Sequence, residues 1–204
     1  MVNDEEGSTS GVVYHFDGGV RTMRFGPMRF RDKLGREVIL RNAEISDAEE
    51  MIRFLDVTAA ESRFLAREPG EVSLTIEQEE CFLHAKIEDS RELLLVAEVG
   101  GKHAGNCSLM CVKNFSRYRH RCEVAIALYQ EFWGAGIGRK MLETVLDVAK
   151  ECGYEQVELE VIEGNDKARA LYEKLGFEEF GHFPDNLKYA DGTYADSFWM
   201  MRKL

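Results

Sequence analysis

A glycine-rich segment in the second half of the chain has the composition of an anion-binding turn. Its residues are Gly134, Ala135, Gly136, Ile137, Gly138 and Arg139. The segment follows a strand-like run and opens a helix-like run. Glycine has no Cβ, so backbone N–H groups at such a turn can approach an anion, and the amino end of a helix adds a positive dipole. The composition therefore predicts binding of a phosphate or diphosphate.

The glycine spacing argues against two common phosphate-binding motifs. A Walker P-loop ends in Gly-Lys-Ser/Thr, whose hydroxyl holds magnesium, but Gly138 precedes Arg139-Lys140-Met141. A dinucleotide-binding fingerprint has the spacing G-x-G-x-x-G near the start of a βαβ unit, whereas Gly134, Gly136 and Gly138 alternate. We therefore expect a different kind of diphosphate cradle and not a nucleotide hydrolase.

The elements around this segment alternate between helix-like and strand-like patterns. In chain order the patterns predict a hairpin of 28–31 and 37–41, a helix from Ser46, a helix over 75–88, strands over 93–99, 102–112 and 121–128, a helix over 137–151, a strand over 156–162, a helix over 167–175, and a closing strand pair of 178–182 and 194–201. Ser46 with Glu49 and Thr75 with Gln78 fit the capping box of a helix start. This order is typical of one mixed α/β domain.

Composition and charge restrict the classes of partner. The chain has 204 residues, 45% of them hydrophobic, which suits a single globular domain. Its formal net charge is −11, and non-specific nucleic-acid binding requires clustered Lys and Arg, so we expect no nucleic-acid partner. A negative surface favours a cationic substrate, although its commoner effect is to keep a protein soluble.

Five scattered cysteines do not form a recognisable framework. They are Cys81, Cys107, Cys111, Cys122 and Cys152. An odd, irregularly spaced set is not typical of a disulfide scaffold, and no second Cys/His pair follows Cys107 and Cys111 at zinc-ligand spacing. We expect reduced thiols and no metal site.

The amino-terminal part differs from the rest of the chain. We expect residues 1–27 to be a partly disordered extension, in which residues 12–28 form an added hairpin or an arm onto a partner subunit, and residues 28–204 to be the domain. Residues 1–10 are polar and acidic, unlike a signal peptide. No apolar run approaches the ~20 residues that cross a bilayer. We therefore expect a cytoplasmic protein without a membrane partner.

Several short runs together resemble one enzyme family. These runs are Ile39-Leu40-Arg41 to Ser46-Asp47-Ala48, Gly134 to Arg139, Leu159-Glu160-Val161, Asn165, Ala170-Leu171-Tyr172-Glu173-Lys174-Leu175-Gly176-Phe177, and Asp191-Gly192-Thr193-Tyr194-Ala195-Asp196. The combination resembles the GNAT N-acetyltransferases over about residues 28–204. Within that family it is nearest to the enzymes that acetylate ribosomal proteins and small amines.

The resemblance implies a fold and an activity. The implied fold is a central mixed, mostly antiparallel sheet that is splayed between its middle strands and flanked by helices. The implied activity is direct transfer of an acetyl group from acetyl-CoA to a primary amine of a small molecule or protein in a ternary complex. The alternative is a catalytically silent acetyl-CoA-binding sensor or regulatory module. Family members often dimerise, so a homodimer is a further expectation.

The resemblance also implies which residues bind acetyl-CoA. The diphosphate is expected on the backbone amides of 134–139, and the pantetheine arm on the backbone of Ile126, Ala127 and Leu128 like an added strand. Asn165 matches a family residue near the pantetheine arm, but it fits a helix cap equally well. The family usually has Arg or Gln at the position of Trp133, so we expect no side-chain contact to the cofactor there.

Three side chains are implied in proton transfer. Tyr172 matches the family's general acid and also contacts the cofactor; alternatively it is only a core aromatic. For the base, Glu160 is the first candidate and Glu123 the second, and both are ordinary strand carboxylates on the alternative interpretation. Glu158 lies on the same strand face as Glu160, so either of the two is expected to assist the other. In the family, substrate selection comes from two segments that correspond here to residues 61–71 and 184–196.

Overall fold

The computed structural model describes residues 11–17 and 20–204, and its centre is a sheet of eight strands. The strands lie in the order β3 (Met28–Arg31), β4 (Glu37–Asn42), β5 (Leu93–Val99), β6 (Lys102–Cys111), β7 (Arg121–Leu128), β8 (Gln156–Ile162), β10 (Tyr194–Lys203) and β9 (Glu178–Lys188). All neighbours are antiparallel except β7 and β8, which are parallel. The mixed, mostly antiparallel sheet is therefore confirmed.

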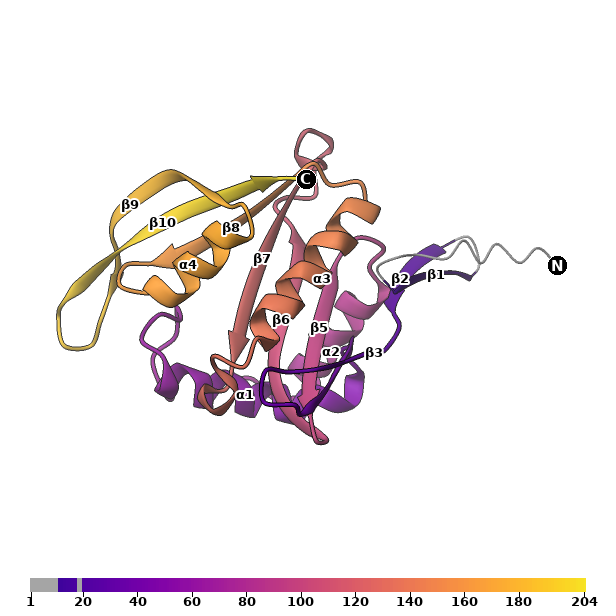
Figure 1. Ribbon diagram of the computed structural model, residues 1–204, viewed down its shortest axis with the longest axis horizontal. Helices are drawn as coiled ribbons and strands as arrows, with labels where there is room; N and C mark the ends of the chain where they lie inside the picture. Colours follow the sequence, from indigo (N-terminus) through magenta and orange to yellow (C-terminus); the bar gives the residue numbers. More distant parts are fainter. Residues whose placement is uncertain (1–10, 18–19) are drawn as a thin grey trace.

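Helices cover both faces of this sheet. They are α1 (Ala48–Glu61), α2 (Ile76–Glu88), α3 (Ile137–Glu151) and α4 (Asp166–Lys174). Helices α3 and α4 lie on one face, and α1 and α2 lie on the other (Figure 1). Short 3-10 turns occur at η1 (Ile45–Asp47), η2 (Ser116–Tyr118) and η3 (Gln130–Phe132).

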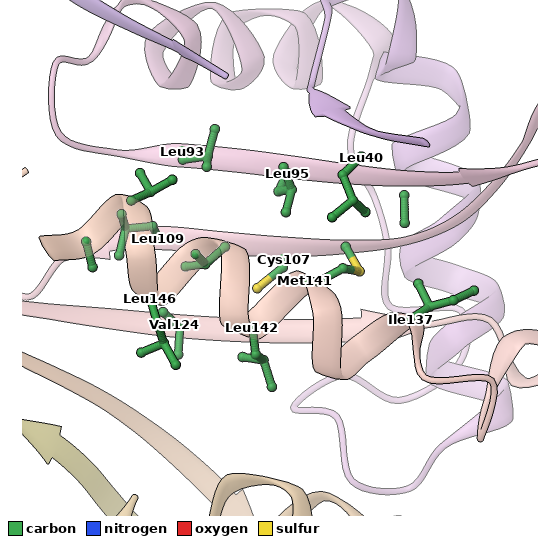
Figure 2. Packing of buried hydrophobic residues seen from close by; sticks show 14 of the residues in the cluster. Leu40, Leu93, Leu95, Cys107, Leu109, Val124, Ile137, Met141, Leu142 and Leu146 are labelled. Atoms are coloured by element: carbon green, nitrogen blue, oxygen red, sulfur yellow. The ribbon is translucent and has the colours of Figure 1, made fainter. Parts of the chain in front are cut away.

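The main core lies between α3 and the sheet. The expected apolar stripe of α3 is completely buried and comprises Met141, Leu142, Val145, Val148 and Ala149. These side chains pack on inward-facing residues of β4 to β7, including Leu40, Leu95 and Val124 (Figure 2). A second, smaller cluster, which includes Met51 and Leu83, fills the space under α1 and α2. The two cores hold the sheet rigid on both sides of the strands that carry the site.

The sheet opens between β7 and β8. Their parallel pairing covers only Arg121–Gln156, Cys122–Val157 and Glu123–Glu158. Beyond Glu123 the two strands diverge, and the ribbon of β7 runs away from β8 and α4 (Figure 1). The expected splay of the middle strands is thus present, and we call the gap beyond Glu123 the slot.

The start of the first helix differs from the expectation. Ser46 and Glu49 do not form a capping box; Glu44 and Asp47 form one at η1, and α1 begins at Ala48. Asp47 is also held by the guanidinium of Arg41 through two bonds of 2.7 Å. This charge-assisted bidentate pair is stronger than a hydroxyl cap. The second capping box, of Thr75 and Gln78, is confirmed.

The closing strand pair is longer than expected. β9 continues past 182 to Lys188 and includes Pro184, which lacks an N–H group. β9 lies at the edge of the sheet, where a proline does not interrupt a ladder. Asp185 has a positive φ of 51°, and the register with β10 shifts between Ala195 and Ser197. The pair is therefore an irregular hairpin, a feature that alternation alone does not reveal.

Part of the amino-terminal segment is built into the domain. β1 (Val12–Asp17) and β2 (Val20–Phe25) form a separate two-stranded hairpin, and Met23 and Phe25 are buried in the main core. The Phe25 amide donates to Oδ1 of Asn42 at 3.0 Å. The disorder expected in the amino-terminal extension falls on residues 1–10, which lie outside the described residues, as do 18–19. Within the described part of the chain, no helix is long and apolar enough to span a bilayer.

Gly105 on β6 is required by close contact with β7. A Cβ at this position would lie 2.5 Å from the carbonyl oxygen of Ala127 and 2.8 Å from Cα of Leu128. We expect Gly105→Ala to lower the free energy of unfolding by about 1–3 kcal/mol, measured by urea denaturation, because β6 and β7 must move apart.

A matched control for this substitution is Gly181→Ala on β9. There a new Cβ would make an ordinary contact of 3.5 Å with Cβ of Trp199, so we expect no loss of stability. Equal effects of the two substitutions would contradict the steric explanation.

Candidate active site

The glycine-rich segment, residues 134–139, connects η3 to α3 and is called the cradle below. Gly134 and Gly136 have positive φ values of 74° and 89°, and Gly136 is the N-cap of α3. Residues with a Cβ rarely adopt this conformation. At Gly138 the reason for glycine is space, because a Cβ there would lie 3.2 Å from Cδ1 of Leu128. The local sequence thus forces the chain into a tight turn directly beside the end of β7.

The backbone amides of the cradle are not used within the protein. From Gly134 to Arg139, no N–H group donates a hydrogen bond to another described residue, and the next amide that does so is that of Lys140, to the Gly136 carbonyl at 3.2 Å. The first turn of α3 also contains no acidic residue. Free amides at a helix amino end, with no carboxylate to neutralise the dipole, form a site for an anion.

The end of β7 offers free backbone groups to the slot. The Tyr129 amide donates to the Ala104 carbonyl on β6 at 3.0 Å. Alternate residues of a strand direct their backbone groups to opposite neighbours, so the groups of Ala127 face β6, whereas those of Ile126 and Leu128 face the slot. The indole Nε1–H of Trp133 donates to the Leu128 carbonyl at 2.8 Å. Trp133 thus binds the strand end, and the expectation that its side chain does not contact the cofactor stays a prediction.

Tyr172 approaches the slot from the face of α3 and α4. The residue is 8% exposed, and its hydroxyl makes no hydrogen bond within the described part of the chain. Burial raises the pKa of Tyr172, and the nearby Cys107 thiol adds to this rise. Cys107 is the residue of β6 that pairs with Ile126 of β7. The Tyr172 hydroxyl therefore lies near Cys107, at the level of Ile126 on β7, and remains protonated at neutral pH.

Three carboxylates meet at the point where β7 and β8 separate. Val157, Leu159 and Val161 face the main core, so Glu158 and Glu160 project from the opposite face. Glu123 pairs with Glu158 across the two strands. The carboxylates therefore lie on the face of α1 and α2, and Tyr172 lies on the other face of the slot.

The three carboxylates have different partners. Glu158 is buried, which raises its pKa, but the guanidinium of Arg121 outweighs this effect and lowers it. One oxygen of Glu160 accepts hydrogen bonds from Ser197 Oγ and from Nδ2 of Asn186 at 2.8 Å. Glu123 has no hydrogen bond within the described residues, and its pKa is raised by burial and by the charges of Glu158 and Glu160. Glu123 is therefore the carboxylate of the three that has free lone pairs and a raised pKa.

Asn165 is a helix cap. Its side-chain oxygen accepts the amide of Ala168 at 3.4 Å at the start of α4. Its expected contact with a pantetheine arm stays a prediction. Within the described residues no group of three or more His, Cys, Asp or Glu side chains has the arrangement of a metal site. The expectation that no metal is needed also stays a prediction.

Comparison with known proteins identifies the family. The model of the Acetyltransferase (GNAT) family matches residues 52–177, more than half of the chain. The chain belongs to the GNAT acetyltransferase family. The resemblance found in the sequence is therefore confirmed, and the protein is an N-acetyltransferase.

Individual relatives cover different shares of this GNAT acetyltransferase. L-amino acid N-acyltransferase MnaT of Escherichia coli (strain K12) is 29% identical over 112 residues, which are 54% of this chain and 64% of that protein. The alignment thus spans less than two thirds of that relative.

Solved structures match over a larger share of the chain. The acetyltransferase of GNAT family from Streptococcus pneumoniae has a TM-score of 0.78 and 27% identity, covering 82% of this chain and 99% of that one. A GNAT superfamily phosphinothricin acetyltransferase from Sinorhizobium meliloti, solved in complex with AcCoA, has a TM-score of 0.73 at 21% identity, covering 82% and 88%. The second likeness concerns the fold alone.

The two segments expected to select the acceptor lie against each other in the GNAT acetyltransferase. The loop after α1 reaches the β9–β10 hairpin, where the Ala190 amide donates to Oε1 of Glu68 at 3.2 Å. The guanidinium of Arg63 lies 4.3 Å from the centre of the Tyr189 ring. Gly164, after β8, faces the ring of Phe64, which a Cβ would approach to 3.7 Å. These contacts join the loop after α1 to the β9–β10 hairpin and to the end of β8.

Sequence reasoning missed the residues that distinguish the three carboxylates of this acetyltransferase. Arg121, Asn186 and Ser197 lie 26 to 37 positions from the glutamates that they hold. No local pattern signals such a partner.

Proposed function

We propose that this GNAT acetyltransferase uses Glu123 as its base and Tyr172 as its acid, on opposite faces of the slot, to transfer an acetyl group from acetyl-CoA to a primary amine. The observation that carries the proposal is the run of free amides from Gly134 to Arg139 at the start of α3. A diphosphate is the anion that such a run accommodates. Acetyl-CoA supplies the acetyl thioester.

The residues of the chain fit this cosubstrate. The cradle amides bind the diphosphate. The free backbone groups of Ile126 and the free amide of Leu128 orient the pantetheine arm in the way that an added strand pairs with an edge. We also place Asn165 and Ala127 beside the pantetheine arm. Side chains larger than glycine at the cradle would oppose the required backbone conformation.

Proton transfer needs one group on each side of the slot. An alkyl amine has a pKa near ~10.4 and arrives mostly as ammonium, so it must lose a proton before it attacks. Glu123 accepts that proton, directly or through water, because its oxygens are free and its pKa is raised. Glu160 keeps Glu123 basic through its negative charge and orients the acceptor.

Tyr172 acts on the leaving group. A coenzyme A thiolate benefits from a proton donor, since thiols have pKa values of about 8.5. Burial raises the pKa of Tyr172, so its hydroxyl is protonated when the thiolate forms and donates to the sulfur. The base on one face serves the amine, and the acid on the other face serves the thioester. Both substrates are therefore bound at the same time, and the acetyl group passes directly from one to the other.

A silent acetyl-CoA-binding module is the alternative. The unpaired hydroxyl of Tyr172 and the unpaired carboxylate of Glu123 favour the enzyme, because buried titratable groups without partners destabilise a fold and are typical of active sites. A homodimer and a cytoplasmic location remain part of the proposal, and we propose no nucleic-acid, membrane or metal partner.

Two measurements test the function. Calorimetric titration with acetyl-CoA should show binding to a single site per chain. Mass spectrometry should then detect the acetylated amine and free coenzyme A with members of a panel of L-amino acids, a polyamine and an alanyl peptide. L-amino acids are tested first, because the Escherichia coli relative is named as an L-amino acid N-acyltransferase. Binding without any acetylated product would support the silent module, and no binding at millimolar acetyl-CoA would contradict both.

A further inference from the structure

The turn between β3 and β4 lies directly against the cradle. The amide of Lys33 donates to the carbonyl of Ala135 at 3.0 Å, although 102 positions separate the two residues in the sequence. No motif in the sequence connects this turn with the glycine-rich segment.

The turn is held rigidly by a buried aspartate. Oδ1 of Asp32 accepts the amides of Leu34 and Arg36, both at 2.9 Å, and Oδ2 accepts Nε of Arg36 at 2.8 Å. The side chain of Asp32 is 0% exposed. The Arg36 guanidinium also lies 5.2 Å from the centre of the Phe132 ring. The turn is thus anchored at two points, at Phe132 before the cradle and at Ala135 within it. These two contacts determine where Lys33 lies.

The side chain of Lys33 covers the cradle. A Cβ added to Gly136 would lie 3.4 to 3.7 Å from Cε, Cγ and Cδ of Lys33. The methylene stem therefore crosses the residue that caps α3. The ammonium group of Lys33 forms no ion pair within the described residues, although acidic residues outnumber basic ones by 37 to 26 in this chain.

This arrangement places positive charge beside positive charge. The amino end of α3 carries the positive pole of the helix dipole, and its first turn has no carboxylate. Lys33 is exposed, so its ammonium is solvated, and it adds to the positive potential of this pole, which attracts an anion. The same anion would satisfy the free amides of the cradle.

We propose that Lys33 is a phosphate-binding residue for coenzyme A, held over the cradle by the Asp32 turn. The inference rests on the proposed function and extends it to a residue outside the family motif. Coenzyme A carries a diphosphate and a 3′-phosphate, and Lys33 binds one of them as a point charge. Its role lies in cofactor affinity and not in the chemical step.

The test compares coenzyme A binding by calorimetry for wild type, Lys33→Met and Lys33→Arg at low and high salt. Methionine keeps the apolar stem and the backbone N–H but removes the charge. We expect Lys33→Met to raise the Kd by about 10-fold at low salt, with a weaker salt dependence, and Lys33→Arg to retain most of the affinity. The matched control is Lys113→Met, in the loop before η2 at the opposite end of β7 from the cradle, which should change neither quantity.

Titration with 3′-dephospho-coenzyme A separates the two phosphates. If the difference between wild type and Lys33→Met disappears, Lys33 binds the 3′-phosphate; if it persists, Lys33 binds the diphosphate. A Kd within about twofold of wild type, with an unchanged salt dependence, would overturn the inference while leaving the proposed function intact. Failure of wild type to bind coenzyme A would overturn both.

Discussion

Tyr172→Phe lowers kcat by about 100-fold or more and changes the Kd of acetyl-CoA by less than about twofold. The substitution removes only the hydroxyl. That hydroxyl makes no hydrogen bond within the described part of the chain, so its loss leaves no buried partner unsatisfied. The ring keeps its contact with Phe177, whose centre lies 6.0 Å away. The effect therefore falls on the step that generates the thiolate and not on folding or cofactor binding.

The measurement is steady-state kinetics with calorimetric titration of the same protein. Tyr118→Phe at η2, at the far end of β7 from the cradle, is the matched control and should leave kcat unchanged. Thermal unfolding of both variants should resemble wild type. An unchanged kcat for Tyr172→Phe would remove Tyr172 as the acid and leave it a core aromatic.

Glu123→Gln lowers kcat/KM by about 100-fold at neutral pH, whereas Glu160→Gln has a smaller effect. Glutamine matches the size of glutamate but accepts no proton. Burial and the charges of Glu158 and Glu160 raise the pKa of Glu123, so its protonation should produce an acid limb in the pH profile of kcat/KM. This limb lies at higher pH than an ordinary glutamate would give. Activity falls as the pH decreases through it, because the base becomes protonated.

The acid limb should be absent in Glu123→Gln and retained in Glu160→Gln. In Glu160→Gln it should move to lower pH, since one of the charges that raises the Glu123 pKa has been removed. Full activity of Glu123→Gln, or loss of the limb in Glu160→Gln, would exchange the roles of the two residues.

The pKa of Glu123 also determines the sign of its effect on stability. A carboxyl whose pKa is higher in the folded state binds its proton more tightly when folded. Its ionised form therefore opposes folding, and this opposition develops as the pH rises from the unfolded to the folded pKa. Glu123→Gln should consequently keep or raise the free energy of unfolding at neutral pH. Lower stability of this variant would show that Glu123 has a structural partner.

The sequence alone determined the elements and the cradle. The α3 boundaries, residues 137–151, and its buried stripe follow from the 3.6-residue period and from glycines at each end. Gly134 and Gly136 were recognisable because positive φ is a local stereochemical requirement. Family motifs added the splayed sheet, Tyr172 and the two glutamates as candidates.

Only the tertiary structure decided which candidates have partners. Arg121 holds Glu158, and Ser197 and Asn186 hold Glu160, so Glu123 alone is left free among the three. Hydrogen bonds between distant residues depend on strand register and packing, which a single sequence does not display. The position of Lys33 over the cradle depends on the same long-range packing. Local backbone stereochemistry can thus be read along the chain, whereas the protonation and charge of the site are properties of the assembled fold.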